Sequence, residues 1–128
     1  MELAPRPTIP AMSTQLEFDL TEVGAADLVT VRGELELASA FALATRFSEV
    51  VEERTGSLIV DLSDLSFMDS TGLNVLLTAF RRLRKRGRAM AIVCPPGPVR
   101  RVFELTRMLE TLSVCDDRDR AMAAAVVS

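Results

Sequence analysis

The segment spanning residues 57–80 constrains the fold most, because its hydrophobic pattern changes period halfway along. It opens with an aliphatic run over residues 58–62, bounded by Gly56, which predicts a buried strand. A polar loop is expected over residues 63–69. From about Ser70 apolar residues recur at helical spacing, and these are Leu73, Leu76, Leu77, Phe80 and Leu83. A strand followed directly by an amphipathic helix is typical of an α/β fold.

The junction between this strand and helix carries polar side chains. Asp69, Ser70 and Thr71 are all residue types that cap helix N-termini, and Gly72 allows a close approach of the backbone. In open α/β sheets, ligands and chemistry gather at the carboxyl ends of strands, which is where these hydroxyl groups are expected.

From the residues alone, Ser70 has two readings that stay open. A capping hydroxyl would stabilise the helix by about 1 kcal/mol. A phosphoryl group on Ser70 would instead add about −1.5 to −2 charges at the positive end of the helix, where backbone N–H groups help to hold it. Asp69 beside it would repel that phosphate.

The rest of the chain alternates strands with helices. Strands are expected over residues 16–20, 28–32, 58–62, 89–94 and 112–115, and helices over residues 39–54, 70–86, 98–109 and 116–127. A short turn over residues 24–27 predicts that the first two strands form an antiparallel hairpin. Strands separated by helices need crossover connections. The sequence thus predicts a mixed β-sheet that starts with a β-hairpin and carries about four helices.

Length and composition indicate one globular domain. The 128 residues suffice for a single core, and 48% of them are hydrophobic. Residues 1–14, which include three prolines, are expected to be a flexible leader before a single domain over residues 15–128, and Met12 is an alternative translation start. No apolar run is long enough to span a bilayer, and the N-terminus lacks the pattern of a signal peptide. A cytoplasmic protein is expected.

The absence of histidine narrows the chemistry. It removes Ser-His and Cys-His catalytic pairs and most zinc sites. Cys94 and Cys115 are expected to be reduced core residues, with a disulfide between them as the alternative.

Enzyme motifs built on the central segment do not fit. A serine nucleophile elbow needs glycine two residues before the serine, where Met68 stands. An aspartic protease would need a second copy of the Asp69 motif. Asp61, Asp64 and Asp69 could form the metal-binding cluster of a phosphoaspartate receiver, but turn and capping roles are favoured. No phosphate-binding glycine loop is present. We therefore expect no enzyme activity, no cofactor and no metal site.

A basic run over residues 81–88 holds six of the fifteen cationic side chains. It could contact nucleic acid or an acidic partner. Because the net charge is −3 and no aromatic platform lies nearby, a solvated helix end whose cations complement the helix dipole is favoured. We expect no nucleic-acid binding and no membrane contact.

Several blocks of the sequence resemble STAS domains, most closely the bacterial anti-sigma factor antagonists. They are Asp61-Leu62-Ser63, Phe67-Met68-Asp69-Ser70-Thr71-Gly72-Leu73, and the second signature Gly33-Glu34-Leu35-Glu36. The resemblance covers about residues 15–125 and implies a STAS-like fold with Ser70 as the phosphoacceptor. Two positions depart from the family pattern: Glu36 replaces the commoner Asp, and Asn74 stands where a second glycine is usual.

The resemblance also implies partners. The unphosphorylated protein would bind an anti-sigma factor that is also a serine kinase, thereby freeing a sigma factor, and a PP2C-type phosphatase would reset the switch. The implied partner-binding residues are Gly33, Glu34, Glu36, Phe67, Asp69, Ser70, Thr71, Gly72 and Asn74. The alternative is a STAS subunit of a transport ATPase or signalling complex that docks without being phosphorylated.

Overall fold

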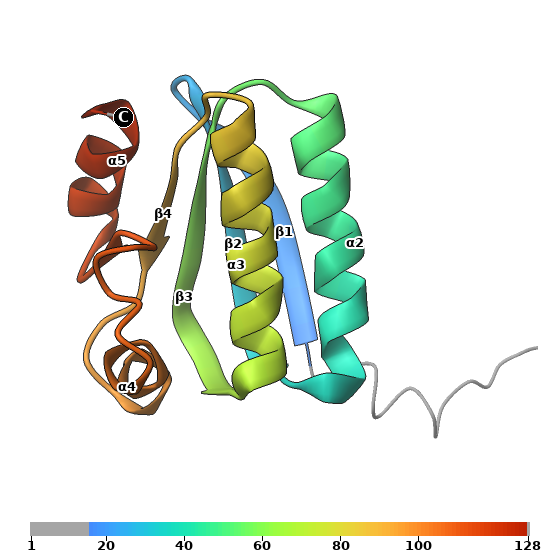
Figure 1. Ribbon diagram of the computed structural model, residues 1–128, viewed down its shortest axis with the longest axis vertical. Helices are drawn as coiled ribbons and strands as arrows, with labels where there is room; N and C mark the ends of the chain where they lie inside the picture. Colours follow the sequence, from blue (N-terminus) through green and yellow to red (C-terminus); the bar gives the residue numbers. More distant parts are fainter. Residues whose placement is uncertain (1–15, 128) are drawn as a thin grey trace, which may run out of the picture.

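The computed structural model describes residues 16–127, which form one mixed β-sheet with helices on both faces (Figure 1). Five strands lie in the order β1-β2-β3-β4-β5. Their bounds are β1 Leu16–Val23, β2 Ala26–Leu35, β3 Ser57–Met68, β4 Met90–Val93 and β5 Val114–Cys115. β1 and β2 pair antiparallel through a tight turn, whereas each later pair is parallel. The predicted order of elements and the opening hairpin are confirmed.

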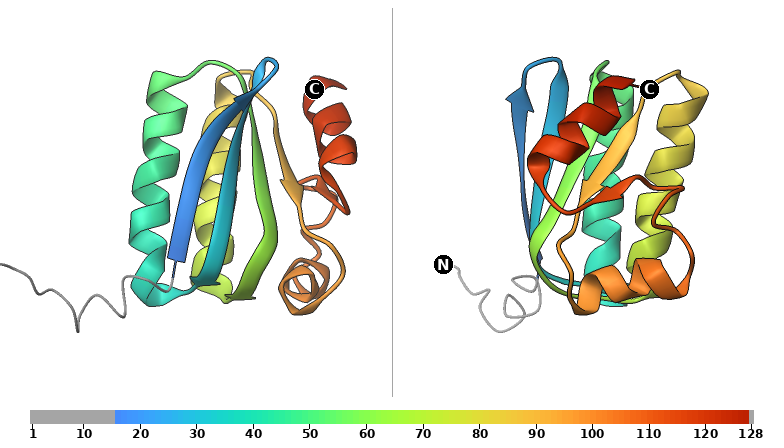
Figure 2. Two further views of the ribbon diagram at one scale, coloured as in Figure 1. Left: turned by 180° about the vertical axis from the view of Figure 1, so that it is seen from behind. Right: turned by 90° about the vertical axis from the view of Figure 1, so that its left-hand side faces the viewer.

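Three helices connect the strands of this part of the chain, and a fourth follows β5. They are α2 Leu37–Glu53, α3 Ser70–Lys85, α4 Pro98–Leu105 and α5 Arg118–Val127. α2 and α3 lie side by side on one face of the sheet, and α4 lies at the end of the sheet where α3 begins (Figures 1 and 2). α5 packs against β3, β4 and β5 on the other face. The N-termini of α2 and α3 therefore point to the same edge of the sheet.

Two hydrophobic clusters fill the two sides of the sheet, because successive strand residues point to opposite faces. The larger cluster packs Val29 and Val31 of β2 against Leu43 and Phe47 of α2 and Leu76 of α3. The smaller cluster is built largely of small residues under α5 and comprises Ala26, Leu28, Ile59, Ala91, Val93, Ala121 and Ala125. The predicted buried face of α2 is confirmed, since Leu43, Phe47, Val50 and Val51 are all buried.

One expected loop is wrong. Residues 63–69 were expected to be irregular, but β3 continues to Met68 and pairs with the end of β2. The polar character of this stretch has a structural cause. β4 pairs with β3 only as far as Asp61, so within residues 16–127 the rest of β3 has no paired strand on that side. Irregular pairing with β2 adds to this, because register shifts between Thr30 and Arg32 and between Gly33 and Glu34 break the strict alternation of buried and exposed residues.

Other element bounds differ modestly from the expected ones. α2 begins at Leu37, and α4 ends at Leu105, so Leu109 is not part of the helix face assigned to it. β5 is only two residues long, and α5 begins at Arg118 rather than at Asp116. The expected leader over residues 1–14 and its boundary with the domain lie outside the described residues. No helix in residues 16–127 combines the length and apolarity that crossing a membrane demands.

The two cysteines are free; Cys94 directly follows β4, and Cys115 lies on the neighbouring strand β5. Cys94 is buried in the larger cluster, whereas Cys115 packs against the smaller one on the other face. The disulfide alternative is therefore wrong for this structure. Burial raises the pKa of the Cys94 thiol to about 11, which keeps the thiol protonated and unreactive at neutral pH.

The basic run over residues 81–88 makes hydrogen bonds and ion pairs that link the end of α3 to the end of α2. The Arg88 guanidinium donates hydrogen bonds to the carbonyls of Val50, Val51 and Gly56, at 3.2, 2.8 and 2.9 Å. Arg82 and Arg86 both form ion pairs with Glu52. The favoured reading, cations at the negative end of a helix, holds with one correction: part of the run complements the C-terminus of α2, not only that of α3.

Candidate functional site

Two helix N-termini start side by side at the carboxyl edge of the sheet. Leu35 of β2 is paired with Met68 of β3, and one residue later each strand turns into a helix. The turn residues are Glu36 before α2 and Asp69 before α3, and both cap their helices. The Asp69 N–H also donates to the Leu35 carbonyl at 3.2 Å, which ties the two strand ends together.

The start of α3 presents a free hydroxyl. The Asp69 carboxylate accepts a hydrogen bond from the Gly72 N–H at 3.1 Å, so Asp69 and not Ser70 provides the cap. Ser70 is the first residue of the helix and is exposed. Within the described part of the chain, its hydroxyl has no hydrogen-bond partner. The capping interpretation of Ser70 is thus corrected, and its oxygen is accessible for chemistry at a helix N-terminus.

Gly72 sets how closely α3 approaches the sheet. A Cβ atom at this position would lie 2.7 Å from Cγ of Leu35 and 2.9 Å from Cγ of Met68. Both side chains are buried in the core, so neither can move away freely. The glycine therefore positions Ser70 by allowing the first turn of α3 to rest on the ends of β2 and β3.

The start of α2 is held by a reciprocal cap. The Glu36 carboxylate accepts from the Ala38 N–H at 2.5 Å, and the Glu36 N–H donates to the Ser39 hydroxyl at 3.2 Å. The Ser39 hydroxyl in turn donates to the Glu34 carbonyl at 2.7 Å. Glu36 thus fills the capping role here, so its replacement of the family's commoner Asp leaves the helix start capped.

Gly33 shapes the end of β2. Its φ of 104° lies in the region that favours glycine, and the register between β2 and β3 shifts directly after it. The Gly33 carbonyl accepts a hydrogen bond from the Ser66 hydroxyl at 2.9 Å. This bulge brings Glu34 opposite Phe67, a residue that is 49% exposed. The Phe67 side chain is thus partly exposed to solvent, close in sequence to the start of α3.

The sequence-predicted residues gather at this one edge. Gly33 and Glu34 lie near the end of β2, Glu36 caps α2, and Phe67 is the second-last residue of β3. The others form the cap and first turns of α3, namely Asp69, Ser70, Thr71, Gly72 and Asn74. Ser70 and Asn74 are exposed and Thr71 is half-buried, whereas Gly72 is buried. Because Asn74 is exposed, the close packing depends on Gly72 and not on a second glycine.

The acidic residues of β3 do not form a receiver-type cluster. Asp61 is 4% exposed, and its carboxylate receives hydrogen bonds from the Ser63 N–H at 2.9 Å and from Arg118 at 2.7 Å. Burial raises the pKa of Asp61, but the hydrogen bonds from Ser63 and Arg118 outweigh it, so the pKa is lowered overall. Asp64 is exposed. Among residues 16–127, no acidic, cysteine or histidine side chains group as a metal site would require.

Sequence reasoning missed two residues near this edge. Leu37 and Phe41 lie one helical turn apart at the start of α2 and are 75% and 81% exposed. The signal was available, because both fall outside the spacing of the buried residues Leu43, Phe47 and Val50. Together with Phe67 they give this end of the molecule an unusual share of exposed apolar side chains.

Comparison with known proteins matches a family model described as the STAS domain to residues 17–121. The anti-sigma F factor antagonist of Paenibacillus polymyxa is 25% identical over 96 residues, which cover 74% of this chain and 82% of that protein. The anti-sigma-B factor antagonist of Listeria monocytogenes is 30% identical over 87 residues, covering 67% and 75%.

Solved structures show the same fold. A crystal structure of an anti-sigma factor antagonist from Mycobacterium paratuberculosis superposes with a TM-score of 0.81 at 26% identity, covering 87% of this chain and 94% of that one. The unphosphorylated form of the anti-sigma factor antagonist SpoIIAA has a TM-score of 0.66 at 21% identity, covering 88% and 99%, which is a likeness of fold alone.

Proposed function

Because this chain belongs to the STAS domain family, we propose that it is an anti-sigma factor antagonist controlled by phosphorylation of Ser70. In the unphosphorylated state it binds an anti-sigma factor that is also a serine kinase, and a sigma factor is released. The relatives named as anti-sigma factor antagonists support this role. The chain acts as a cytoplasmic binding module, and the catalytic steps belong to its partners.

The observation that carries the proposal is the free, exposed hydroxyl of Ser70 at the first position of α3. Asp69 already caps the helix, so Ser70 can be modified without removing the cap. Phe67 near the end of β3 and Leu37 at the start of α2 add exposed apolar surface to the same end of the sheet. A partner that covers this edge would enclose the Ser70 oxygen within the contact.

The switch then follows from charge. The Ser70 oxygen attacks the γ-phosphorus of kinase-bound ATP, the bond to the bridging oxygen breaks, ADP leaves, and the serine proton is released. The product carries about −1.5 to −2 charges in a contact that had been neutral at that point. Desolvation and repulsion of such a group cost a few kcal/mol, and each 1.4 kcal/mol weakens binding about tenfold. A PP2C-type phosphatase restores the hydroxyl by hydrolysing the phosphate ester.

Phosphoryl transfer to Ser70 is tested by intact-mass measurement after incubation with ATP and the candidate serine-kinase anti-sigma factors of the source organism. We expect one added phosphate on the wild-type chain and none on Ser70→Ala. Thr71→Ala should still be modified, which separates the two adjacent hydroxyls. Absence of transfer with every candidate kinase would instead favour an unmodified STAS subunit of a larger complex.

Binding is tested by titration calorimetry with the same partner. Ser70→Ala should bind like the unmodified chain, while Ser70→Asp should bind at least tenfold more weakly. Thr55→Asp is the matched control, because Thr55 is exposed and precedes β3, at the opposite end of that strand from Ser70. Equal affinities of Ser70→Ala and Ser70→Asp would contradict control by charge at this position.

A further inference from the structure

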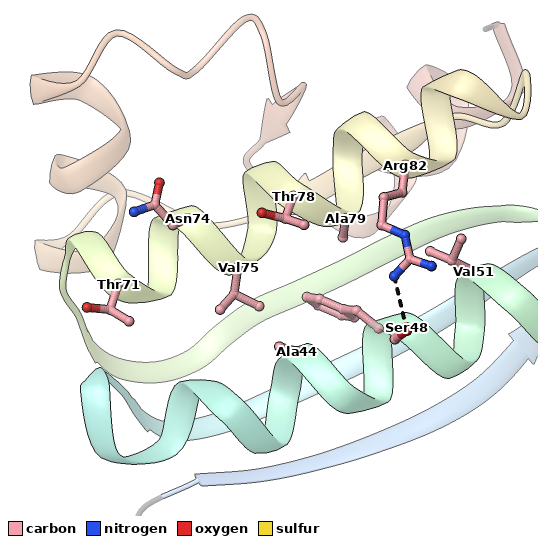
Figure 3. A pocket seen from close by; sticks show the side chains of 10 residues that line it. Ala44, Ser48, Val51, Thr71, Asn74, Val75, Thr78, Ala79 and Arg82 are labelled. Atoms are coloured by element: carbon pink, nitrogen blue, oxygen red, sulfur yellow. Dashed lines mark hydrogen bonds between the residues drawn. The ribbon is translucent and has the colours of Figure 1, made fainter.

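A groove runs between the two parallel helices that cover the sheet (Figure 3). Its volume is about 230 Å³. On the α3 side it is lined by Thr71, Val75, Thr78 and Arg82, which recur at positions i, i+4, i+7 and i+11. Such spacing places them in one row along the helix, about 16 Å long or three turns. The row starts at the residue after Ser70.

The facing row on α2 extends the groove towards the Ser70 end. Ala44 and Ser48 line the groove, and Leu37 and Phe41 precede them at the same i, i+4, i+7 and i+11 spacing. Ala44 is half-buried, whereas Leu37 and Phe41 are 75% and 81% exposed. An apolar strip therefore continues from the floor of the groove onto the open surface at the edge that holds Ser70.

The far end of the groove is closed and offers no site for an anion. The Arg82 guanidinium donates to the Ser48 hydroxyl at 3.0 Å (Figure 3). It also pairs with Glu52 at 2.7 Å, so Arg82 bridges the two helices. Arg82 is thus already neutralised. The volume of about 230 Å³ also falls below the ~300–1,000 Å³ of ordinary small-molecule sites. Side chains of a protein suit this groove better than a cofactor does.

The exposed area is too small for a permanent dimer. Leu37 and Phe41 together present on the order of 300 Å². A specific, stable interface buries about 1,200–2,000 Å² in total. The strip therefore suits a partner that binds reversibly and anchors a few apolar side chains. An amphipathic helix, whose apolar residues recur every three or four positions, matches a groove between two helices.

We propose that the α2–α3 groove, with Leu37 and Phe41 at its mouth, docks an amphipathic helix of the protein that acts on Ser70. This inference rests on the proposed function for the identity of that partner, but not for the presence of the docking surface. Ser70 is not among the lining residues, so the apolar anchor stays available when Ser70 is phosphorylated. The anchor sets how tightly the partner is held, and the charge on Ser70 modulates that affinity.

The occupant is identified by photo-crosslinking in cells of the source organism, using the full chain with p-benzoylphenylalanine in place of Phe41. We expect a crosslink to a second protein, mapped by mass spectrometry to a segment with amphipathic helical periodicity. A crosslink to residues 1–15 of the same chain, to a second copy of the chain, or to nothing would overturn the proposal.

The energetic test measures the affinity of the chain for the partner protein that crosslinking identifies, after that partner has been purified. Phe41→Ala should weaken its binding at least tenfold, and Thr78→Arg, which blocks the groove from the α3 side, should do the same. Leu105→Ala is the matched control, since Leu105 is 74% exposed on α4, away from the groove. Circular dichroism should show that all three variants fold like the wild type. Unchanged affinity of Phe41→Ala and Thr78→Arg would refute the docking role.

Two further comparisons separate this inference from the proposed function. The fold-change caused by Phe41→Ala should be similar in the Ser70→Ala and Ser70→Asp backgrounds, because the anchor and the charge act independently. If Ser70 is phosphorylated while Phe41→Ala has no effect on binding, the function stands and the groove inference fails. If Ser70 accepts no phosphate while Phe41→Ala still weakens the complex, the groove inference stands and the proposed phosphorylation switch fails.

Discussion

Asp69 and Gly72 together determine where the Ser70 hydroxyl lies. Asp69 supplies the oxygen that caps α3, and Gly72 supplies both the N–H that it accepts and the space that lets α3 approach Leu35 and Met68. The hydroxyl of Ser70, which lies between them in the sequence, makes no hydrogen bond within the described part of the chain. A residue that is free of structural roles can change its charge without changing the fold.

The close contact at Gly72 leads to a stability prediction. Gly72→Ala would push its Cβ atom against buried side chains, so we expect the free energy of unfolding to fall by about 1–3 kcal/mol, despite the higher helix propensity of alanine. Urea denaturation measures this change. Asn74→Ala, at an exposed position two residues later in α3, should cost less than about 0.5 kcal/mol. Equal stability of Gly72→Ala and wild type would show that α3 can shift outward at no cost.

Single residues also show where sequence reasoning reaches its limit. Ser70 and Gly72 could be singled out because a cap motif is local and readable within four consecutive residues. The spacing of Leu37 and Phe41 separates them from the buried residues of α2, but it does not show whether another element of the fold covers them. The folded structure shows that they stay uncovered within residues 16–127, since they are 75% and 81% exposed.

Among the helices and strands, α5 is attached to the sheet through an ion pair as well as apolar contacts. Its buried residues Ala121 and Ala125 are small, so they bury little apolar area against β3 and β4. The Arg118 guanidinium at its start pairs with the buried Asp61 carboxylate at 2.7 Å. Since an unpaired buried carboxylate is costly, the pair couples α5 to the centre of the sheet.

This pair predicts how stability depends on pH. The pKa of Asp61 is lowered in the folded state, so the ionised carboxylate stabilises the fold above its unfolded pKa of about 3.9. That contribution is lost as the pH falls through the lowered pKa. The difference in unfolding free energy between wild type and Asp61→Asn should therefore be largest above about pH 4 and shrink below it. Urea denaturation from pH 7 downward measures this difference.

A matched control is available on the same strand. Asp64 is exposed, so Asp64→Asn should change stability little across the same pH range. A difference between wild type and Asp61→Asn that stays constant down to acid pH would show that the ion pair with Arg118 is not the stabilising feature. This pair was not predicted from the sequence because Asp61 and Arg118 are 57 residues apart in the chain.

At the scale of the whole molecule, the proposed control site and the core are separated. The larger core lies between the sheet and the inner faces of α2 and α3, whereas Ser70 lies at the edge where both helices begin. A charge at the N-terminus of α3 meets the positive end of the helix dipole, which offsets repulsion from Asp69. Phosphorylation would then alter recognition without loosening the domain.

We accordingly expect Ser70→Asp to change the free energy of unfolding by less than about 1 kcal/mol. Thermal melts followed by circular dichroism, for the wild type, Ser70→Ala and Ser70→Asp, provide the measurement. The chain phosphorylated on Ser70 should melt within a few degrees of the unmodified chain. Loss of cooperative melting in either charged form would mean that the charge acts by unfolding the domain and not by blocking a contact.

The order of elements, the opening hairpin and a helix that begins at capping residues near Ser70 are local properties, and the sequence alone determined them. They follow from hydrophobic period, turn residues and helix-capping residues within short windows. The length of β3, the free Ser70 hydroxyl, the reach of Arg88 to the end of α2 and the open groove beside Phe41 depended on the tertiary structure. Each of these requires knowing which segment stands next to which, and distance along the chain does not encode that proximity.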